Sequence, residues 1–282
     1  MARTLPVVLS IAGFDPSSGA GITADIKAIA AHGCYGVACI TALTVQSTSE
    51  VKRVQPIDPL LVRETLECLA NDMEIAAIRI GMLGSGEVAG AVADFLDQVR
   101  VPKVVLDPVI VSSSGVRLVD DAAVHVLLTR LLPVATVITP NIHEASTLTG
   151  IEVTTSEQMR TAADRLHEMG GRAVVITGGD LDKAIDLLSF QDRNGIQRET
   201  FKSDKLRSNS THGTGCAFAS AIACHLAQGR GLPEAVLLAK AYVTAAIANA
   251  VPLGKGIGPV NHLYRMNEQR RAATADMEPL SH

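Results

Sequence analysis

Short apolar runs alternate along most of this chain with stretches in which apolar residues recur every three or four positions. A continuous apolar run predicts a buried strand, because both faces of such a strand are covered. The helical period predicts an amphipathic helix. The first pair is a strand over residues 7–12 and a helix over residues 22–32, which stops at Gly33 because glycine commonly ends a helix.

The same alternation continues through the middle of the chain. Strands that alternate with helices indicate an α/β protein with a mainly parallel sheet and helices on both faces, in three layers. Ligands of such sheets bind beyond the carboxyl ends of the strands. Further strands are predicted over residues 36–46, 76–80, 104–107, 137–139 and 173–177, and further helices over residues 58–71, 87–99, 122–131, 141–148 and 156–169.

The last third of the chain departs from this rhythm. Residues 184–201 are predicted to form two antiparallel strands around an Arg193-Asn194-Gly195 turn. A polar, glycine-bearing stretch up to Gly215 then runs into a small-residue apolar helix, and another helix is predicted over residues 232–251. The chain shows neither a linker nor a repeat, so we expect a single domain over residues 1–282, with a frayed tail over residues 265–282.

Composition excludes several classes of protein. The chain has 282 residues, 47% of them hydrophobic, which is enough for a large core. A net charge of −4 and the absence of tryptophan give no basic or stacking surface for nucleic acid. The start is too weakly apolar for a signal peptide, and no apolar run reaches the roughly 18 residues of a membrane span. Five scattered cysteines without CxxC spacing indicate reduced thiols in a cytoplasmic protein, without zinc or disulfides.

Gly213 and Gly215 lie where the polar loop enters its helix. The first N–H groups of a helix lack internal partners and carry a positive dipole, so a phosphate fits there. The alternative is a glycine-rich cap on a core helix. The same position is expected to lower the thiol pKa of Cys216, so that a thiolate could act as general base. In the competing hypothesis Cys216 contributes only its backbone N–H.

Two nucleotide-binding motifs are absent or out of place. Residues 19–24 match the G-x-G-x-x-A dinucleotide pattern, but the glycines come about six residues late after the first strand. The second strand ends at Gln46, where a dinucleotide site needs an acidic residue. The chain also lacks a G-x-x-x-x-G-K-[ST] loop, which excludes a P-loop NTPase.

Two carboxylates are expected at the carboxyl edge of the sheet. Asp107 closes a buried strand, and Glu144 follows Asn141 by three residues, which also fits a helix capping box. Magnesium held through water would sit between such carboxylates. Other polar residues have structural interpretations too: Asp25 as a first-turn acid that favours the helix dipole, Gln46 as a polar strand end, and Lys240 as a snorkelling lysine.

Taken together, these segments resemble the hydroxymethylpyrimidine (phosphate) kinases of thiamine synthesis, within the ribokinase-like small-molecule kinases. The likeness covers roughly residues 5–264 in the same order. Phe14 departs from the small polar residue expected at its place, which affects the shape of the pocket. The matching segments are residues 11–22, 24–27, 35–36, 40–46, 81–84, 106–109, 139–141 with Glu144, 211–216, 240–246 and 258–262.

The resemblance implies a ribokinase-like fold and ATP-dependent phosphorylation of 4-amino-5-hydroxymethyl-2-methylpyrimidine and its monophosphate, with Mg2+, in a protein that often forms homodimers. Pyridoxal kinase activity on the same fold is the alternative. A hydrolase with a Cys216 nucleophile and His212, and a non-catalytic ligand-binding protein, are hypotheses from other classes. The implied site comprises Gly213, Gly215 and Cys216 as anion hole and catalytic residues; Gly13, Asp25, Gln46, Met82 and Val109 for the pyrimidine; Asn141, Thr211 and Lys240 for ATP; and Asp107 and Glu144 for the metal.

Overall fold

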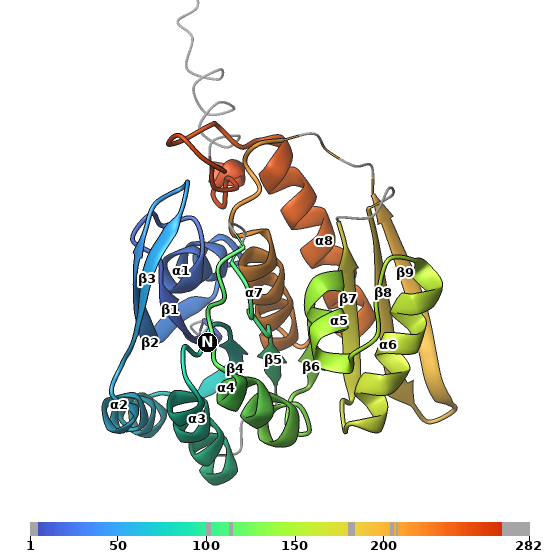
Figure 1. Ribbon diagram of the computed structural model, residues 1–282, viewed down its shortest axis with the longest axis horizontal. Helices are drawn as coiled ribbons and strands as arrows, with labels where there is room; N and C mark the ends of the chain where they lie inside the picture. Colours follow the sequence, from blue (N-terminus) through green and yellow to red (C-terminus); the bar gives the residue numbers. More distant parts are fainter. Residues whose placement is uncertain are drawn as a thin grey trace, which may run out of the picture.

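One continuous sheet crosses the molecule in the computed structural model, which describes residues 5–99, 103–112, 115–179, 184–203, 206 and 208–266 (Figure 1). The strand order is β3-β2-β1-β4-β5-β6-β7-β8-β9. The six neighbouring strands β2, β1, β4, β5, β6 and β7 run parallel, whereas β3, β8 and β9 pair in antiparallel fashion at the two edges. The strands are β1 Val7–Phe14, β2 Tyr35–Gln46, β3 Val51–Pro56, β4 Ile75–Ile80, β5 Val104–Leu106, β6 Val137–Ile138, β7 Ala173–Gly178, β8 Ala184–Asp192 and β9 Gly195–Ser203.

Helices cover both faces of this sheet. One layer consists of α1, α7 and α8, and the other of α2 to α6 (Figure 1). The predicted three-layer α/β architecture is therefore confirmed. The helices are α1 Gly21–Ala31, α2 Pro59–Asp72, α3 Gly86–Gln98, α4 Asp121–Val126 with the π-helical turn η1 Leu127–Leu131, α5 Ile142–Thr149, α6 Ser156–Glu168, α7 Thr214–Ala227 and α8 Leu232–Ala248.

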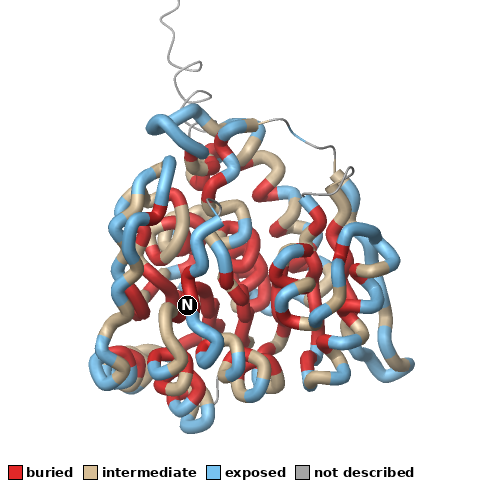
Figure 2. Tube along the Cα trace, in the orientation of Figure 1, coloured by how far each residue is buried: buried red, intermediate tan, exposed pale blue. Residues whose placement is uncertain are grey.

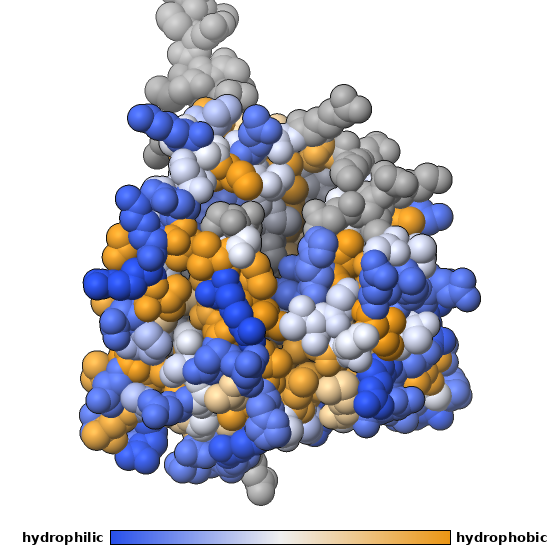
Figure 3. Space-filling model, in the orientation of Figure 1, coloured by the Kyte–Doolittle hydropathy of each residue, from blue (hydrophilic) through white to orange (hydrophobic). Residues whose placement is uncertain are grey.

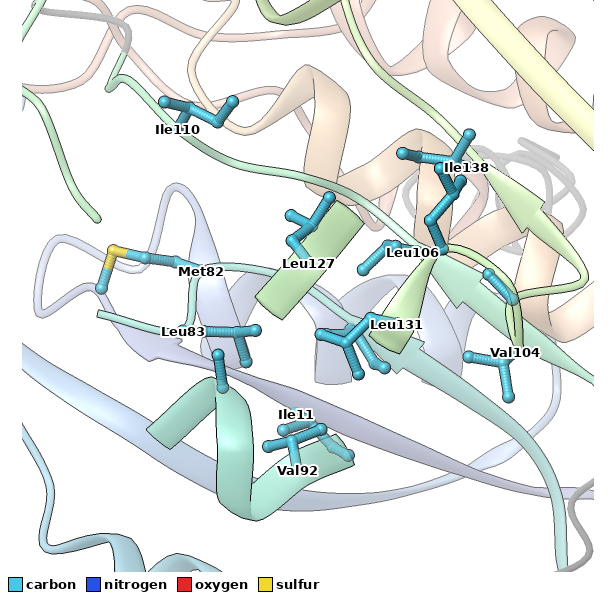
Figure 4. Close-up of a cluster of buried hydrophobic side chains, with 14 of the residues drawn as sticks. Ile11, Met82, Leu83, Val92, Val104, Leu106, Ile110, Leu127, Leu131 and Ile138 are labelled. Atoms are coloured by element: carbon cyan, nitrogen blue, oxygen red, sulfur yellow. The ribbon is translucent and has the colours of Figure 1, made fainter. Parts of the chain in front are cut away.

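The apolar strands divide their side chains between two cores, because successive residues of a strand point to opposite faces. On β4, Ile78 and Ile80 join the core beneath α2 to α6, and Ala77 joins the core beneath α1, α7 and α8. Figure 4 shows part of the first core, where Leu106 of β5 packs near Leu131 of η1. The buried residues concentrate along the central strands (Figure 2).

The predicted elements are present with ends shifted by at most three residues, and one strand was missed. Strand β3 pairs antiparallel with β2, and the Ser47 N–H donates to the Glu50 carbonyl in the connecting turn at 2.9 Å. Its residues Lys52 and Arg53 are exposed at the edge of the sheet, so β3 carries no apolar run. The predicted hairpin is confirmed, and Gly195, with φ +105°, forms part of its turn.

Three sequence predictions concern the limits of the chain. The described strands all belong to one sheet. A single domain over residues 1–282 stays a prediction. The predicted frayed tail lies, from residue 267 onward, outside the described residues. Within the described ranges, no helix combines the length and apolar character that crossing a bilayer requires. The cytoplasmic location stays a prediction.

Candidate active site

The carboxyl ends of the parallel strands bring several of the predicted residues to one edge of the sheet. Gln46 ends β2, Gly81 follows β4 directly, and Asp107 follows β5 directly. Asn141 lies three residues after β6 and caps α5. This is the edge at which ligands of open α/β sheets bind.

The loop before α7 packs tightly on the loop before α1. Gly213 caps α7 with φ +81°, and a Cβ on this residue would overlap the carbonyl oxygen of Gly19. No side chain caps either α7 or α1 among the described residues. The Gly21 N–H hydrogen-bonds the sulfur of Cys216. Two helix N-termini with uncapped N–H groups therefore meet around Cys216, which suits an anionic ligand.

A buried contact between His212 and Asp15 holds these two loops together. His212 Nε2 lies 2.8 Å from Asp15 Oδ2, and Asp15 also accepts hydrogen bonds from Ser17 and from the Ala20 N–H. Burial alone would raise the pKa of Asp15, but the bonds from His212 and Ser17 bring it below its ordinary value. Asp15 is thus an ionised anchor. His212 was considered only as a hydrolase partner in the sequence, and its anchoring role was missed.

A cavity of about 340 Å³ opens beside the contact between His212 and Asp15. Its walls include Gln46, His212, the β2–β3 turn and residues 255–257. The nitrogen Nε2 of Gln46 lies 3.4 Å from His212 Nε2.

The other residues predicted for the pyrimidine are distributed around the strand ends. A Cβ on Gly13 would overlap the methyl group of Met82, so these two residues touch. Val109 is partly buried against the core beneath α2 to α6. Figure 4 places Met82 at the margin of the same core. Contact of Gly13, Met82 or Val109 with a pyrimidine stays a prediction.

Asp25 lies in a fully buried charged cluster. The carboxylate accepts hydrogen bonds from Ser10 Oγ at 2.6 Å and from Ser220 Oγ at 2.9 Å. It also forms an ion pair with Arg79, with 2.8 Å between Nη1 and Oδ2. The other end of the guanidinium, Nη2, lies 2.5 Å from Oδ2 of Asp107. Both oxygens of Asp25 are thus engaged by protein groups. A role of Asp25 in pyrimidine binding stays a prediction.

Sequence reasoning missed Arg79 altogether. The signal was present, because a basic residue inside the apolar strand β4 must find a partner when it is buried. The partners come from α1 and from the end of β5, 54 and 28 residues away. Such distant pairing cannot be derived from one sequence.

The predicted lowering of the Cys216 pKa is wrong. Burial raises the pKa of this thiol to about 12, even though the residue as a whole is partly exposed. The Arg79 charge and the Gly21 N–H lower it, but Asp25 and Asp107 raise it further. The thiol therefore keeps its proton at neutral pH. A helix N-terminus does not outweigh burial beside two carboxylates.

Glu144 forms the capping box that the sequence suggested. The Asn141 N–H donates to Oε2 at 3.0 Å, and the Glu144 N–H donates to Asn141 Oδ1 at 2.9 Å. The Ile110 N–H donates to Oε1 at 3.3 Å. Burial first, and then the charge of Asp107, raise the pKa of Glu144 to about 8. The two carboxylates thus interact, as expected for neighbours, while their metal-binding role stays a prediction.

Lys240 is paired rather than free in solvent. Its Nζ lies 2.7 Å from Oδ2 of Asp186 on β8, and Asp186 Oδ1 accepts the Gly178 N–H at the end of β7. Thr211 is exposed at the start of the glycine loop, and its carbonyl accepts from the Thr214 hydroxyl. ATP contacts of Lys240, Thr211 and Asn141 stay predictions.

Solved structures with this fold define the class of protein. Bacillus subtilis pyridoxal kinase, in a complex with ADP, superimposes with a TM-score of 0.84 and 34% identity, over 94% of this chain and 100% of that one. The phosphomethylpyrimidine kinase of Clostridium difficile gives a TM-score of 0.76 and 35% identity, over 86% and 99%. The fold is that of the ribokinase-like small-molecule kinases.

Sequence comparison defines the family more narrowly. Residues 15–261 match the model of the family described as phosphomethylpyrimidine kinase, and the chain belongs to that family. The hydroxymethylpyrimidine/phosphomethylpyrimidine kinase of Streptomyces coelicolor is 42% identical over 266 residues, which cover 94% of this chain and 97% of that protein. The thiamine biosynthesis bifunctional protein ThiED of Geobacter sulfurreducens is 44% identical over 265 residues, or 93% of this chain. The match takes up 53% of ThiED, so the chain spans about half of its length.

Proposed function

We propose that this protein transfers a phosphoryl group from ATP to the hydroxyl of 4-amino-5-hydroxymethyl-2-methylpyrimidine, and then to the resulting monophosphate, in thiamine biosynthesis. One observation carries the proposal. The glycine loop of α7 is fixed against the loop of α1, beside a cavity that contains Gln46. An anion-binding helix end and a small-molecule pocket therefore adjoin, as phosphoryl transfer to a small acceptor requires.

Phosphoryl transfer asks the protein mainly to position groups and to neutralise charge. The N–H groups of Gly215 and Cys216, near the start of α7, are the donors that would stabilise the transferring phosphoryl group. The protonated thiol of Cys216 is a poor general base, since its pKa is raised to about 12. We therefore assign Cys216 a backbone role. A loose transition state needs little help from a base.

Recognition of the pyrimidine would fall to Gln46. An amide both donates and accepts hydrogen bonds, which matches the amino group and ring nitrogen of an aminopyrimidine edge. The cavity of about 340 Å³ lies within the usual size of small-molecule sites. Gly13 and Met82 would supply an apolar contact for the ring.

Magnesium would accompany ATP at Asp107 and Glu144. Their oxygen donors suit Mg2+, which usually keeps several waters and binds one or two carboxylates together with phosphates. The described residues contain no group of three His, Cys, Asp or Glu side chains that could hold a metal, so this pair fits an ion carried mainly by the nucleotide. Asn141, Thr211 and Lys240 would contact ATP.

We also propose a homodimer. Leu43 and Val45 of β2 are exposed, and apolar surface gathers over the β2–β3 side of the molecule (Figure 3). Exposed apolar patches commonly mark protein interfaces.

An ADP-release assay tests the proposal on four acceptors: the pyrimidine alcohol, its monophosphate, pyridoxal and pyridoxine. We expect kcat/KM for the pyrimidine alcohol to exceed that for pyridoxal by at least about tenfold, which corresponds to about 1.4 kcal/mol of transition-state binding. ADP release without dependence on any acceptor would contradict the proposal.

Pyridoxal kinase is the second candidate, because the Bacillus subtilis enzyme shares this fold so closely. A staphylococcal pyridoxal kinase solved with AMP-PCP and pyridoxal also superimposes, with a TM-score of 0.82. A pyridoxal ring lacks the aminopyrimidine edge that Gln46 would bind. A kcat/KM for pyridoxal equal to or above that for the pyrimidine would support this second candidate.

A further inference from the structure

We infer that Arg79 is a positioning residue for phosphoryl transfer, which fixes the carboxylate of Asp107 relative to the anion loop at Cys216. The inference rests on the proposed function and adds a residue to its machinery. Arg79 has no solvent exposure and projects from β4 toward the layer of α1 and α7. From there it reaches three separate segments of the chain.

The first step is geometric. Nη1 is held by Asp25, which is itself fixed by hydroxyl groups from β1 and α7. Nη2 is left to bind Asp107 at 2.5 Å. A planar guanidinium with both ends engaged fixes the orientation of each carboxylate, which a single ammonium group cannot do. Asp25 thus acts as the clamp, and Asp107 is the group that Arg79 orients.

The second step links this clamp to the anion loop. Arg79 also hydrogen-bonds the side chain of Cys216, two residues into α7 from its first residue. The Cys216 sulfur accepts the Gly21 N–H as well. One guanidinium therefore contacts both the carboxylate at the end of β5 and the loop that would hold the phosphoryl group. Asp25 ties the same guanidinium to Ser220 of α7 as well, so this placement does not depend on the sulfur alone.

The third step concerns stability. Buried ion clusters are weak evidence for stabilisation, because apolar replacements of similar size often do as well. Within the described residues, Nε of Arg79 is buried and lacks a hydrogen-bond partner. In an ion cluster that served only to stabilise the fold, we would expect this Nε–H group to be hydrogen-bonded. The arrangement instead fits a site in which orientation of the Asp107 carboxylate matters.

Gly81 leaves room for the side chain of Arg79. A Cβ on Gly81 would overlap Nη1 of Arg79. The glycine that follows β4 directly therefore leaves the space that the guanidinium occupies. Residue 81 and Arg79 form one structural unit at the edge of the sheet.

The decisive variant is Arg79→Lys, which keeps the charge but cannot bind both carboxylates. Its matched control is Arg130→Lys, because Arg130 also bridges two aspartates, Asp94 and Asp97, on the surface. We expect Arg79→Lys to lower kcat by about 10²-fold, the cost of a misplacement of about 1 Å, with KM for both substrates within about threefold. Arg130→Lys should leave kcat, both KM values and the unfolding transition unchanged.

A second variant decides the matter if Arg79→Lys does not fold. Asp25→Asn keeps the size of the clamp and weakens its hold on Arg79. The positioning role predicts a lower kcat with an unchanged KM for the pyrimidine, whereas direct substrate binding by Asp25 predicts a raised KM.

The outcomes separate this inference from the proposed function. A wild-type protein that transfers no phosphoryl group to the pyrimidine contradicts the proposed function. An active wild type together with a folded Arg79→Lys whose kcat stays within about threefold contradicts the positioning role alone.

Discussion

Two of the described arginines, Arg79 and Arg130, each bridge a pair of aspartates in very different surroundings. Arg79 joins Asp25 and Asp107 with no exposure of its side chain. Arg130 joins Asp94 and Asp97 with 37% of its side chain exposed. The distances are alike, at 2.8 and 2.5 Å for the first bridge and 2.8 and 2.6 Å for the second.

The comparison shows that ion-pair geometry alone says little about consequence. Water and salt screen the bridge of Arg130, and each of its partners can be solvated without it. The partners of Arg79 have no such replacement. Loss of its charge leaves two buried carboxylates unpaired. The surface bridge is therefore expected to be expendable and the buried one to be essential.

The largest effect should come from Arg79→Met, which removes the charge from the buried bridge. Breaking a buried pair typically destabilises a protein by about 3–5 kcal/mol, whereas an exposed pair contributes about 0–1 kcal/mol. Urea unfolding of Arg79→Met and Arg130→Met measures this difference directly. Equal losses of unfolding free energy in the two variants would abolish the distinction between buried and exposed bridges.

A smaller effect is expected from Gly81→Ala, which intrudes on the buried bridge without changing its charges. The new Cβ would overlap Nη1 of Arg79, and overpacking of this kind costs about 1–3 kcal/mol. Gly90→Ala on α3 is the control, because a Cβ there meets nothing within 4 Å. Alanine in that helix should stabilise by about 0.5–1 kcal/mol. Similar unfolding free energies for both variants would show that the Arg79 side chain moves away from the new Cβ at little cost.

The pH dependence of stability sharpens the comparison at Glu144, which adds a third buried carboxylate beside Asp107. Its pKa is raised from 4.5 to about 8, so the folded protein binds this proton more tightly than the unfolded chain does. The contribution of this proton to the free energy of unfolding is complete below about pH 4.5 and is lost as the pH rises through about 8.

Glu144→Gln tests this linkage and preserves the capping box, in which glutamine also serves. We expect the unfolding free energy of the variant to change less between about pH 5 and pH 8 than that of the wild type. The measurement is urea unfolding at both pH values. An equally steep fall in the variant would show that Glu144 does not carry this dependence.

The smallest effect is expected from Cys216→Ala, which removes the sulfur beside Arg79 and keeps the backbone N–H. Since the thiol keeps its proton, single-turnover kcat should fall by less than about fivefold, rather than the 10²–10⁴-fold typical of a lost general base. The pH profile between about pH 6 and pH 9 should stay in place. A large fall with a moved profile would restore the general-base hypothesis.

The fold could be predicted far better than the chemistry of the cluster. Buried strands such as β1 and β4 are apolar runs, and helix ends carry local signals, such as Asp58 before α2. Strand β3 escaped prediction because an exposed edge strand needs no apolar run. The Asn141–Glu144 capping box was recognisable because both partners lie within four residues.

The remaining features depend on contacts between distant segments. Arg79 is a single charge in an apolar strand, and nothing nearby reveals Asp25 or Asp107 as its partners. The pKa of Cys216 was misjudged for the same reason. The helix N-terminus is visible in the sequence, whereas burial of the sulfur and the two carboxylates around it are tertiary facts.

Phosphorus NMR of the reaction mixture tests the central claim most directly. The wild-type protein is incubated with Mg·ATP and 4-amino-5-hydroxymethyl-2-methylpyrimidine, and the signals of the acceptor's phosphate groups are followed over time. The account predicts that a monophosphate ester appears first and gives way to a diphosphate, while ATP is converted to ADP. Conversion of ATP to ADP and free phosphate without any phosphorylated pyrimidine would contradict it.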